Sequence, residues 1–467
     1  MEPFAPVDEA LLAALREAVG ETQVLTAPES LERYASDATE GYRFLPEVVA
    51  LPGDAEQVAA VLALAARARV AVTPRGGGSG LSGGALPVAG GIVLSVERLD
   101  RIRSVDAADM VAEVESGVRT IDLHEALEAK GLLYPPDPSS RDMSMLGGNL
   151  GEDAAGPRSL SYGTTRHHVL GLEVALADGS LLRTGGRNRK DAAGYNLTQL
   201  LVGSEGTLGV ITAATLKLSP APRASLSLML PFRELEQAAA AVEAVCRAHR
   251  AVVACELVER HAIAAVATLM PVPPWLLEQE ALLLLELHGD DAEQLLVVAA
   301  EVGEAAEALG CGEVQVAQEA AEQRRLWAVR RRVGEAVMQR GAYRESDAVV
   351  PRSRLADLVR AARRAAGAQG LTAVCFGHAG DGNLHIDLLR GELSEERWEA
   401  ARDAAEAALL AEVLAMGGSI TGEHGIGWTL REELPRAVSP AHLALMRAIK
   451  RVFDPAGILN PGKIFLD

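Results

Sequence analysis

Apolar residues recur at helical spacing in two windows near the start of the chain, residues 7–19 and 54–69. In each window the apolar side chains would share one face, so each predicts an amphipathic helix. After the second window, residues 70–73 and 92–96 form short β-branched runs that predict strands. This order of helices and strands favours an α/β or α+β fold.

Strand-like stretches separated by glycine-rich loops continue to residue 218. Residues 111–114 and 210–218 show the pattern clearly. Pro220 and Pro222 then end it. We therefore interpret residues 1–221 as one domain of nucleotide-binding size.

The composition then shifts toward alanine, glutamate and leucine, and long helical windows alternate with strand candidates. This pattern predicts a second, α+β domain in which helices lie on one face of an antiparallel sheet. The last fifty residues return to glycine-rich loops and one short helix. The helical windows are residues 234–248, 292–309, 395–416 and 440–453, and the strand candidates are residues 226–230, 282–287 and 314–316.

The amino-acid composition indicates a folded protein and argues against several classes of partner and metal site. The 467 residues are 49% hydrophobic and 23% charged, which supplies a sizeable core and argues against disorder. Acidic residues outnumber basic ones by 64 to 45, and the net charge of −19 repels phosphate backbones, so nucleic acid is not an expected partner. The four cysteines lack C-x-x-C spacing, which excludes an iron–sulfur cluster or a thiolate zinc site built by this chain alone.

The sequence predicts no membrane-spanning segment and no secretory signal. The longest apolar run, residues 281–285, ends at Glu286 and is far shorter than the roughly 20 residues of a membrane-spanning helix. Glu2, Asp8 and Glu9 stand where a secretory signal carries positive charge. We expect a cytoplasmic protein, with any attachment to a membrane made through partners.

The glycine-rich run at residues 74–84 contains a literal G-x-G-x-x-G at Gly78, Gly80 and Gly83. A Rossmann fingerprint would open a helix here, whereas this run leads through Pro87 into a strand, and no Walker ending follows. Successive glycines still allow backbone N–H groups to form an anion nest. A flexible surface loop would explain any such run taken alone.

Three more loops of small residues follow, and four such loops in one domain are hard to attribute to turns. Small side chains at separated points allow close backbone approach along a long, flat ligand, and a dinucleotide has that shape. FAD is the leading candidate. The three loops are Gly147–Gly156, Tyr162–Thr164 and Gly203–Gly209.

Seven ordered motifs carry a family resemblance. They are PRGGGSGLSGGA, GGNLGEDAAG, YGTTRHHVLGLEVALADG, VGSEGTLGVIT, FGHAGDGNLH, GEHGIG and FDPAGILNPGK. From about residue 40 onward the chain resembles the FAD-linked oxidases related to vanillyl-alcohol oxidase. Within them it is most similar to the branch of D-lactate dehydrogenase, D-2-hydroxyglutarate dehydrogenase and the glycolate oxidase flavin subunit.

The resemblance implies a domain plan. It predicts a two-subdomain FAD-binding domain of vanillyl-alcohol oxidase type at residues 1–221 and an α+β cap domain with an antiparallel sheet at residues 222–416. It also predicts that residues 417–467 return to the FAD domain and the active site. The fold class is α+β.

The family's cofactor residues can be carried over one by one. Covalent relatives use a histidine in the first loop, near Ser79, and none occurs here, so the resemblance implies non-covalent FAD. Asp153 and Ala155 depart from the Asn and Gly usual in relatives. The matching residues are Arg75, Gly76, Gly77, Gly78, Ser79, Gly80, Leu81, Ser82, Pro136, Asp137, Pro138, Ser139, Gly147, Gly148, Asn149, Gly151, Ala154, Gly156, Tyr162, Gly163, Glu205, Gly206, Ile211 and Asn460.

Histidines and acids near the C-terminus suggest a metal site. A two-residue type I′ turn at Asp381-Gly382 would place His378 directly opposite His385. Two facing imidazoles with a nearby carboxylate form a set that binds divalent metals, and Gly422–Gly425 offers Glu423 and His424. A structural role is the usual explanation for a lone histidine, but a facing pair beside this loop favours a site.

The resemblance assigns roles to these residues. It implies that His378, His385 and Glu423 bind a divalent metal, with zinc, manganese and iron all compatible, and that His424 is the general base. It implies that Asn383 and Asn460 line substrate and flavin. Arg330, in a Trp-x-x-Arg context, is similar to an arginine that grips a substrate carboxylate, although a solvated arginine in a run of three fits the sequence nearly as well.

The expected function is FAD-dependent oxidation of a D-2-hydroxy acid, D-lactate or glycolate first, to the 2-oxo acid by hydride transfer to flavin N5. The electron acceptor is not NAD and is otherwise open. D-2-hydroxyglutarate dehydrogenase is an alternative, which Glu345 makes less favoured because that enzyme carries a lysine near this point. A non-catalytic flavin subunit of a glycolate oxidase assembly is another alternative. Alkyl-glycerone-phosphate synthase is a third, but this chain lacks the three-histidine run that the synthase has near its C-terminus. We also expect a homodimer, and partner subunits if the chain belongs to such an assembly.

Overall fold

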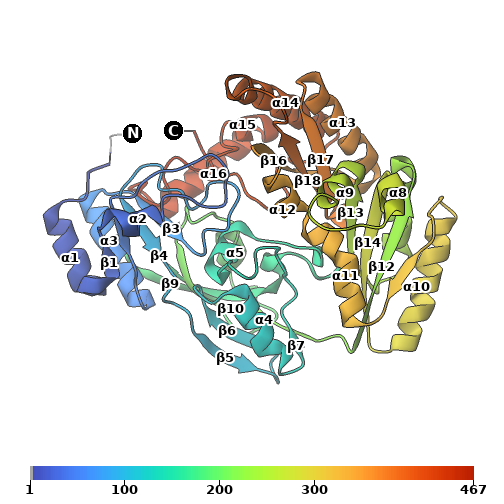
Figure 1. The fold of residues 1–467 in the computed structure, drawn as a ribbon. Coiled ribbons are helices and arrows are strands. Elements are labelled where there is room, and N and C mark those ends of the chain that lie inside the picture. The colour runs from blue at the N-terminus through green and yellow to red at the C-terminus, as the bar shows by residue number, and fades with distance from the viewer. Residues whose placement is uncertain (1–3, 467) are drawn as a thin grey trace. The chain divides into compact units, whose positions relative to one another are not determined.

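The structure, a computed structural model, describes residues 4–466 and consists of two compact units (Figure 1). The first unit contains the chain up to Ala155, residues Gly163–Ala221 and the chain from Glu423 onward. The second contains Gly156–Tyr162 and Pro222–Gly422. Among the described residues, no helix combines the length and the apolar character needed to cross a membrane.

The first unit begins with a four-stranded sheet in the order β1-β2-β4-β3, in which β2, β4 and β3 are parallel. The helices α1 (Glu9–Val19) and α3 (Ala55–Ala68) share an apolar core with this sheet. Asp54 caps α3 by accepting a hydrogen bond from Gln57 N at 2.7 Å. Both helices were predicted from their periodicity and are confirmed. The strands are β1 (Val24–Leu25), β2 (Val48–Ala50), β4 (Ile92–Ser95) and β3 (Val72–Arg75).

A five-stranded antiparallel sheet in the order β5-β6-β10-β8-β9 forms the second layer of this unit. Its apolar side chains form one core with α4 (Thr120–Glu128) and α5 (Leu146–Glu152). The strands are β5 (Ile102–Asp106), β6 (Val111–Glu115), β10 (Val210–Lys217), β8 (Val169–Ala175) and β9 (Leu181–Gly185).

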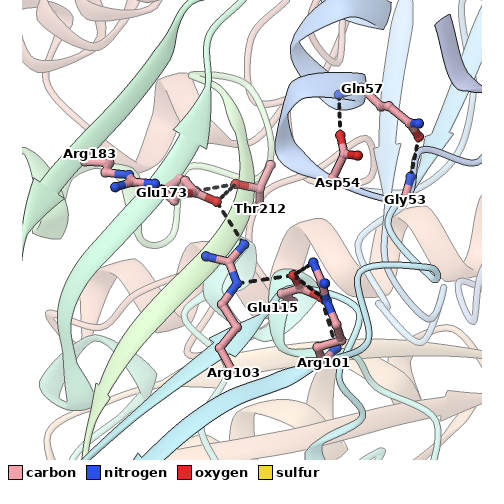
Figure 2. A network of polar contacts seen from close by, with 9 residues as sticks. All are labelled: Gly53, Asp54, Gln57, Arg101, Arg103, Glu115, Glu173, Arg183 and Thr212. Atoms are coloured by element: carbon pink, nitrogen blue, oxygen red, sulfur yellow. Dashed lines mark hydrogen bonds and ion pairs between the residues drawn. The ribbon is translucent and has the colours of Figure 1, made fainter.

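The polar side of the five-stranded sheet is held by two buried glutamates that share Arg103 (Figure 2). Glu115 has no exposed surface and accepts hydrogen bonds from Arg101 and Arg103. Glu173 accepts from Arg103, Arg183 and Thr212 Oγ1. A buried carboxylate is tolerated only when it is paired and hydrogen-bonded, and these arginines supply both.

The C-terminal segment completes the first unit. Helix α16 (Pro440–Phe453) has the bounds that the sequence predicts, because Ser439 caps it and proline occupies its first position. Beyond it, Val72 N donates to Ile458 O and Asn460 N donates to Val72 O, both at 2.8 Å. These bonds attach residues 458–460 to the edge strand β3 as a short parallel bridge.

The second unit is built on a seven-stranded antiparallel sheet in the order β15-β12-β14-β13-β17-β18-β16 (Figure 1). The predicted antiparallel cap sheet is therefore confirmed. The strands are β15 (Gln315–Ala317), β12 (Ala224–Phe232), β14 (Ala281–Gly289), β13 (Val252–Glu259), β17 (Thr372–Gly377), β18 (Asn383–Leu389) and β16 (Tyr343–Val349).

Helices cover both faces of this sheet, so the expectation of helices on one face is wrong. Strand β14 shows why, because its leucines alternate between two cores: Leu283 and Leu285 join one, and Leu282 and Leu284 join the other. The first core is covered by α8 (Leu235–Ala248), α10 (Ala292–Glu307), α13 (Leu355–Ala368) and α14 (Glu395–Ala415), and the second by α9 (Arg260–Val266), α11 (Ala320–Arg331) and α12 (Val333–Met338).

Short elements connect these layers. They are η1 (Glu21–Gln23), α2 (Pro28–Glu32), β7 (Leu132–Leu133), α6 (Ser159–Tyr162), η2 (Thr165–His168), α7 (Leu197–Leu201), β11 (Ser219–Pro220), η3 (Pro274–Glu278), η4 (Arg352–Arg354), η5 (Ala379–Asp381) and α15 (Leu434–Ala437), where η denotes a 3₁₀ turn.

Candidate active site

The first predicted cofactor loop, Gly76–Gly80, follows strand β3 and lies against the residues that lead into α5. A Cβ atom at Gly76 would lie 3.3 Å from Gly148 N, and one at Gly77 would lie 2.2 Å from Met143 O. Only glycine permits this approach of one backbone to another. Two of the predicted flavin loops are thus neighbours in the first unit.

The Gly203–Gly209 loop joins them. Glu205 N donates to Gly151 O at 2.8 Å, and the next residue, Gly206, has a positive φ of 65°. The Tyr162–Thr164 loop divides between the units, because Tyr162 belongs to the second unit and Gly163 to the first. Gly156, the last residue of the Gly147–Gly156 loop, also belongs to the second unit. Tyr162 Oη is hydrogen-bonded to His288 Nδ1 at 3.0 Å within the second unit.

The first unit fits an anionic cofactor at the glycine loops. Arg75 is buried, and among the described residues its Nη1 atom has no hydrogen-bond partner. Burial lowers the pKa of Arg75, although the charge of Asp37 opposes that shift. The positions of a Cβ at Gly80 and Gly148 meet no atom within 4 Å, so there is open space beside the backbone. A buried guanidinium nitrogen without a hydrogen-bond partner, beside open backbone, is the arrangement that a pyrophosphate would complete.

Several predicted cofactor residues use their side chains to hold the loops together. Asn149 Nδ2 donates to Thr120 Oγ1, and Asp137 pairs with Arg141. Asn460 Nδ2 donates to the carbonyl oxygens of Gly84 and Glu205. Backbone contacts with a cofactor remain a prediction for these residues. The other carried-over positions lie in the same unit: Gly78, Ser79, Leu81 and Ser82 in the first loop, Pro136, Pro138 and Ser139 before α5, Gly147 in α5, Ala154 after it, and Ile211 on β10.

The departure at residue 153 has a physical reason. Asp153 ends α5 in the left-handed conformation with φ 57°, which asparagine and aspartate tolerate better than most residues. Its carboxylate accepts a hydrogen bond from Arg166 N at 2.7 Å and forms an ion pair with the Arg166 side chain. Aspartate can therefore stand at this position in place of asparagine, because Arg166 pairs with its charge.

A buried group of charges lies beside the loops of the first unit. Burial raises the pKa of Glu205, and it raises the pKa of Glu152 well above its ordinary value with help from the charge of Glu205. Burial lowers the pKa of Lys463 to about 7. Lys463 Nζ donates to Gly84 O and Asn460 Oδ1, each at 2.7 Å. Glu152 therefore holds its proton more readily than an ordinary glutamate.

The predicted hairpin register at the histidines is wrong. Strands β17 and β18 pair Phe376 with His385, and His378 lies beyond the end of β17. Residues 379–381 form a 3₁₀ turn, with Asn383 N donating to His378 O, where a two-residue turn was expected. The imidazole rings of His378 and His385 nevertheless lie 5.3 Å apart between centroids.

His378 is oriented by a carboxylate that the sequence did not single out. Glu256, on β13, is fully buried and its Oε1 lies 2.7 Å from His378 Nδ1. Its other oxygen accepts a hydrogen bond from Arg330 Nε at 2.8 Å. Burial raises the pKa of Glu256, but the charges of His378 and Arg330 outweigh burial and lower it to about 2. Glu256 is thus a charged acceptor between the two.

Arg330 is buried, so the alternative interpretation as a solvated arginine is wrong. Its guanidinium lies over the Phe376 ring, 4.9 Å from the centroid. Among the described residues, the guanidinium donates a hydrogen bond through Nε alone. This arrangement fixes the plane of the side chain at one end and leaves its terminal nitrogens to meet a planar anion.

Asp347 organises the chain around His385 and the loop that follows α14. It is buried on β16, and its Oδ1 accepts a hydrogen bond from Asn383 Nδ2 at 2.6 Å. Its Oδ2 accepts from Thr421 Oγ1 at 2.9 Å and from Gly422 N at 2.7 Å. Glu345, on the same strand, lies 3.4 Å from His385 Nδ1. Asn383 is thus linked to this loop indirectly, because Asp347 accepts hydrogen bonds from both.

Glu423 and His424 directly follow Gly422 and begin the last segment of the first unit. Within that unit, Glu423 Oε2 accepts a hydrogen bond from Ala155 N at 3.2 Å. Two residues span at most about 7 Å of extended chain. His424 therefore lies only two residues along the chain from Gly422, whose N–H is bound by Asp347.

Comparison with known proteins settles the family. The model for the C-terminal domain of FAD linked oxidases matches residues 221–464, and the model for an FAD binding domain matches residues 46–185. The chain belongs to the FAD-linked oxidase family. It is 36% identical to the glycolate oxidase subunit GlcD of Bacillus subtilis, over 92% of each chain, and 34% identical to a D-lactate dehydrogenase of Anaerostipes hadrus, over 95% of this chain and 94% of that protein.

The fold of this FAD-linked oxidase is also found in a solved structure. The structure of p-cresol methylhydroxylase with substrate bound superimposes with a TM-score of 0.83 and covers 100% of this chain and 99% of that chain, at 19% identity. The predicted two-domain FAD-binding fold is therefore confirmed. FAD is the cofactor that the family membership supports.

Sequence reasoning missed the buried acids of this FAD-linked oxidase. Glu256 stands in the strand VVACELVE, where an isolated acid within an apolar run signals a buried charge that needs a partner. Glu152 and Asp347 gave weaker signals because both stand among polar neighbours. No pattern in the sequence pairs Glu256 with Arg330, 74 residues away.

Proposed function

We propose that this FAD-linked oxidase oxidises a small D-2-hydroxy acid to the 2-oxo acid, with D-lactate and glycolate as the first candidates, and passes the electrons to an acceptor other than NAD. The observation that carries the proposal is the group Glu256, Arg330, His378 and His385, which brings a buried arginine and two buried imidazoles together in the second unit. The names of the two relatives agree with it.

Arg330 would bind the substrate carboxylate. Its plane is set by Glu256 at Nε and by the Phe376 ring beneath it. A carboxylate that met the two terminal nitrogens would form the bidentate pair that arginine favours. Because the site is buried, such a pair would be strengthened by low dielectric and would select for an anionic substrate.

Two imidazoles and a carboxylate are a donor set that divalent metals bind. We propose His378, His385 and Glu423 as the ligands of such a metal. Glu256 would orient His378 through Nδ1, so ligation would use Nε2, which is the usual way in which a carboxylate fixes a metal-binding histidine. The metal would supply charge that lowers the pKa of the substrate hydroxyl.

His424 would take the hydroxyl proton on an imidazole nitrogen. Bound FAD would accept the hydride from the α-carbon. Asp347 would keep the chain before His424 in place through Thr421 and Gly422.

The surroundings of His385 favour a monocarboxylic substrate. Glu345 lies 3.4 Å from His385 Nδ1, and its charge would repel a second carboxylate. Arg344, the nearest cation along the strand, is directed to Glu406 on α14, with Nε 3.1 Å from Glu406 Oε1. D-2-hydroxyglutarate is therefore the alternative substrate and not the first.

A second candidate is a flavin-bearing subunit without activity of its own, because the Bacillus subtilis relative is named as a subunit. Under this alternative, partner subunits would complete the enzyme. We favour the catalytic role because the buried histidine, arginine and glutamate group is complete in this chain. A homodimer and a cytoplasmic location remain part of the proposal.

The full chain, purified alone, tests these alternatives by dye reduction with D-lactate, glycolate, D-2-hydroxyglutarate and L-lactate. We expect turnover of a D-2-hydroxy acid or glycolate, and we expect His424→Ala to slow anaerobic flavin reduction by about 10² to 10⁴-fold with FAD still bound. Wild-type speed in His424→Ala would remove the proposed base. Reduction by none of the acids would favour the non-catalytic subunit.

The metal is tested separately by elemental analysis. His385→Ala should lose the metal while keeping its FAD, because His385 lies in the second unit and the glycine loops lie in the first. His261→Ala is the matched control, since His261 is a histidine of the same unit that is bonded to Ala373 O. Equal metal content in the wild type and in His385→Ala would exclude the ligand set.

A further inference from the structure

One buried carboxylate, Glu205, accepts two backbone hydrogen bonds from the loop that carries His424. Glu205 Oε1 accepts a hydrogen bond from Ile426 N at 2.9 Å, and Glu205 Oε2 accepts one from Gly427 N at 2.6 Å. Each oxygen thus receives its own amide. The side chain is buried, so water does not compete for these amides.

Glu205 is itself held in place at both ends of its backbone. Its N–H donates to Gly151 O at 2.8 Å, and its carbonyl accepts from Asn460 Nδ2 at 2.8 Å. It adopts the left-handed conformation with φ 52°, which residues other than glycine rarely adopt. Such a conformation persists only where the surroundings impose it. The carboxylate is therefore presented from a fixed point.

The chain next to His424 lies directly against this carboxylate. A Cβ at Gly425, whose φ is 81°, would lie 2.5 Å from Glu152 Oε2 and 3.0 Å from Glu205 Oε1. A Cβ at Gly427 would lie 2.2 Å from Ser82 O. The backbone that follows His424 is thus packed directly on two buried acids and on the end of the first glycine loop.

We propose that Glu205 is a positioning residue for His424, which it holds through the amides of residues 426 and 427. The inference rests on the proposed role of His424 as the base. It differs from the role of flavin contact that the family resemblance implies for Glu205, because both carboxylate oxygens are occupied by the loop. Its loss would misplace the imidazole without removing any group that touches the substrate.

Glu205→Gln is the principal variant. It keeps the size of the side chain but turns one acceptor into an N–H donor that faces a backbone N–H. Glu205→Asp keeps the charge and shortens the reach, and it serves if the glutamine variant does not fold. Glu173→Gln is the matched control, because Glu173 is a buried glutamate of the same unit whose partners are Arg103, Arg183 and Thr212.

Hydrogen exchange of the flavin-free full chain gives a readout that needs no activity. In Glu205→Gln, the amides of Ile426 and Gly427 should exchange at least about 10-fold faster than in the wild type, because each loses or weakens its acceptor. Glu173→Gln should leave their exchange unchanged. Equal protection of these amides in wild type and Glu205→Gln would overturn the proposal.

Anaerobic flavin reduction of the loaded protein then tests the link to His424. Glu205→Gln should reduce its flavin about 10²-fold more slowly at saturating substrate, with half-saturation and FAD content near wild type. The double variant with His424→Ala should be no slower than His424→Ala alone, because the two residues act as one unit.

The outcomes separate this inference from the proposed function. A slow His424→Ala with a fast Glu205→Gln would overturn the role of Glu205 alone. A double variant whose loss is the product of the single losses would do the same. A fast His424→Ala would overturn the proposed base, and the positioning role would fall with it.

Discussion

Replacing Glu256 by glutamine should destabilise the second unit, because it leaves Arg330 buried without its counter-charge. Glu256 has no exposed surface and Arg330 is 7% exposed, so water cannot take the place of the carboxylate. Removing one partner of a buried ion pair costs about 3–5 kcal/mol. Glutamine keeps only one acceptor oxygen, so one of the two hydrogen bonds, to His378 Nδ1 or to Arg330 Nε, is lost in the same change, and we expect the upper part of that range.

Urea unfolding of the flavin-free chain, followed by tryptophan fluorescence, measures this cost. Three of the four tryptophans, Trp275, Trp327 and Trp398, lie in the second unit, so the signal reports mainly on that unit. A chain of two units need not unfold in one step, and the transition of the second unit is the one to compare.

A double-variant cycle isolates the pair from other effects of the substitution. With Arg330→Met, Glu256→Gln should show a coupling of about 1–3 kcal/mol, because the second change removes the charge that the first left alone. Glu406→Gln is the control, since Glu406 pairs with the less deeply buried Arg344 in the same unit. A loss below about 0.5 kcal/mol in Glu256→Gln, or costs that simply add, would refute the reasoning.

Two further predictions concern the first unit. The flavin should leave the protein on acid precipitation, because the first loop has Ser79 where covalent relatives have histidine; colour retained by the washed pellet would contradict this. The wild-type first unit should gain about 2 kcal/mol of stability between pH 7 and 9, because the pKa of Lys463 is lowered to about 7 in the fold and the unfolded chain binds more protons above that pH. Lys463→Met should lack this rise in pH-dependent denaturation, and an equal rise in both proteins would exclude Lys463 as its source.

Local periodicity and caps predicted several of the longer helices, but not α4, α11 or α13. Residues 440–453 form a helix with the predicted bounds because the cap, the first-turn proline and the apolar spacing all agree. Strand candidates matched β4, β6, β10, β12 and β14, whereas β13 and β16 were not predicted. These signals act over a few residues, and a single sequence contains them in full.

The register of the β17–β18 hairpin and the contacts between distant residues were harder to predict from the sequence. The turn at Asp381-Gly382 was expected to be two residues long, but the chain closes a 3₁₀ turn with His378 O as acceptor, which moves the histidines out of direct opposition. Glu205 meets Gly427 across 222 residues, and no local pattern specifies that contact. The family motifs include Glu205 as well as the loop that carries Glu423 and His424, but they do not show that Glu205 holds this loop.

The attachment of residues 458–460 to β3 has a consequence for how the chain folds during synthesis. The edge of β3 that accepts this segment is exposed from the time residue 75 leaves the ribosome, and its partner is made about 380 residues later. An unpaired edge strand is a site for wrong pairing with other chains. The whole second unit is translated during this interval, so the edge of β3 in the nascent first unit must be protected from other chains. A stalled or truncated product should aggregate through this unpaired edge.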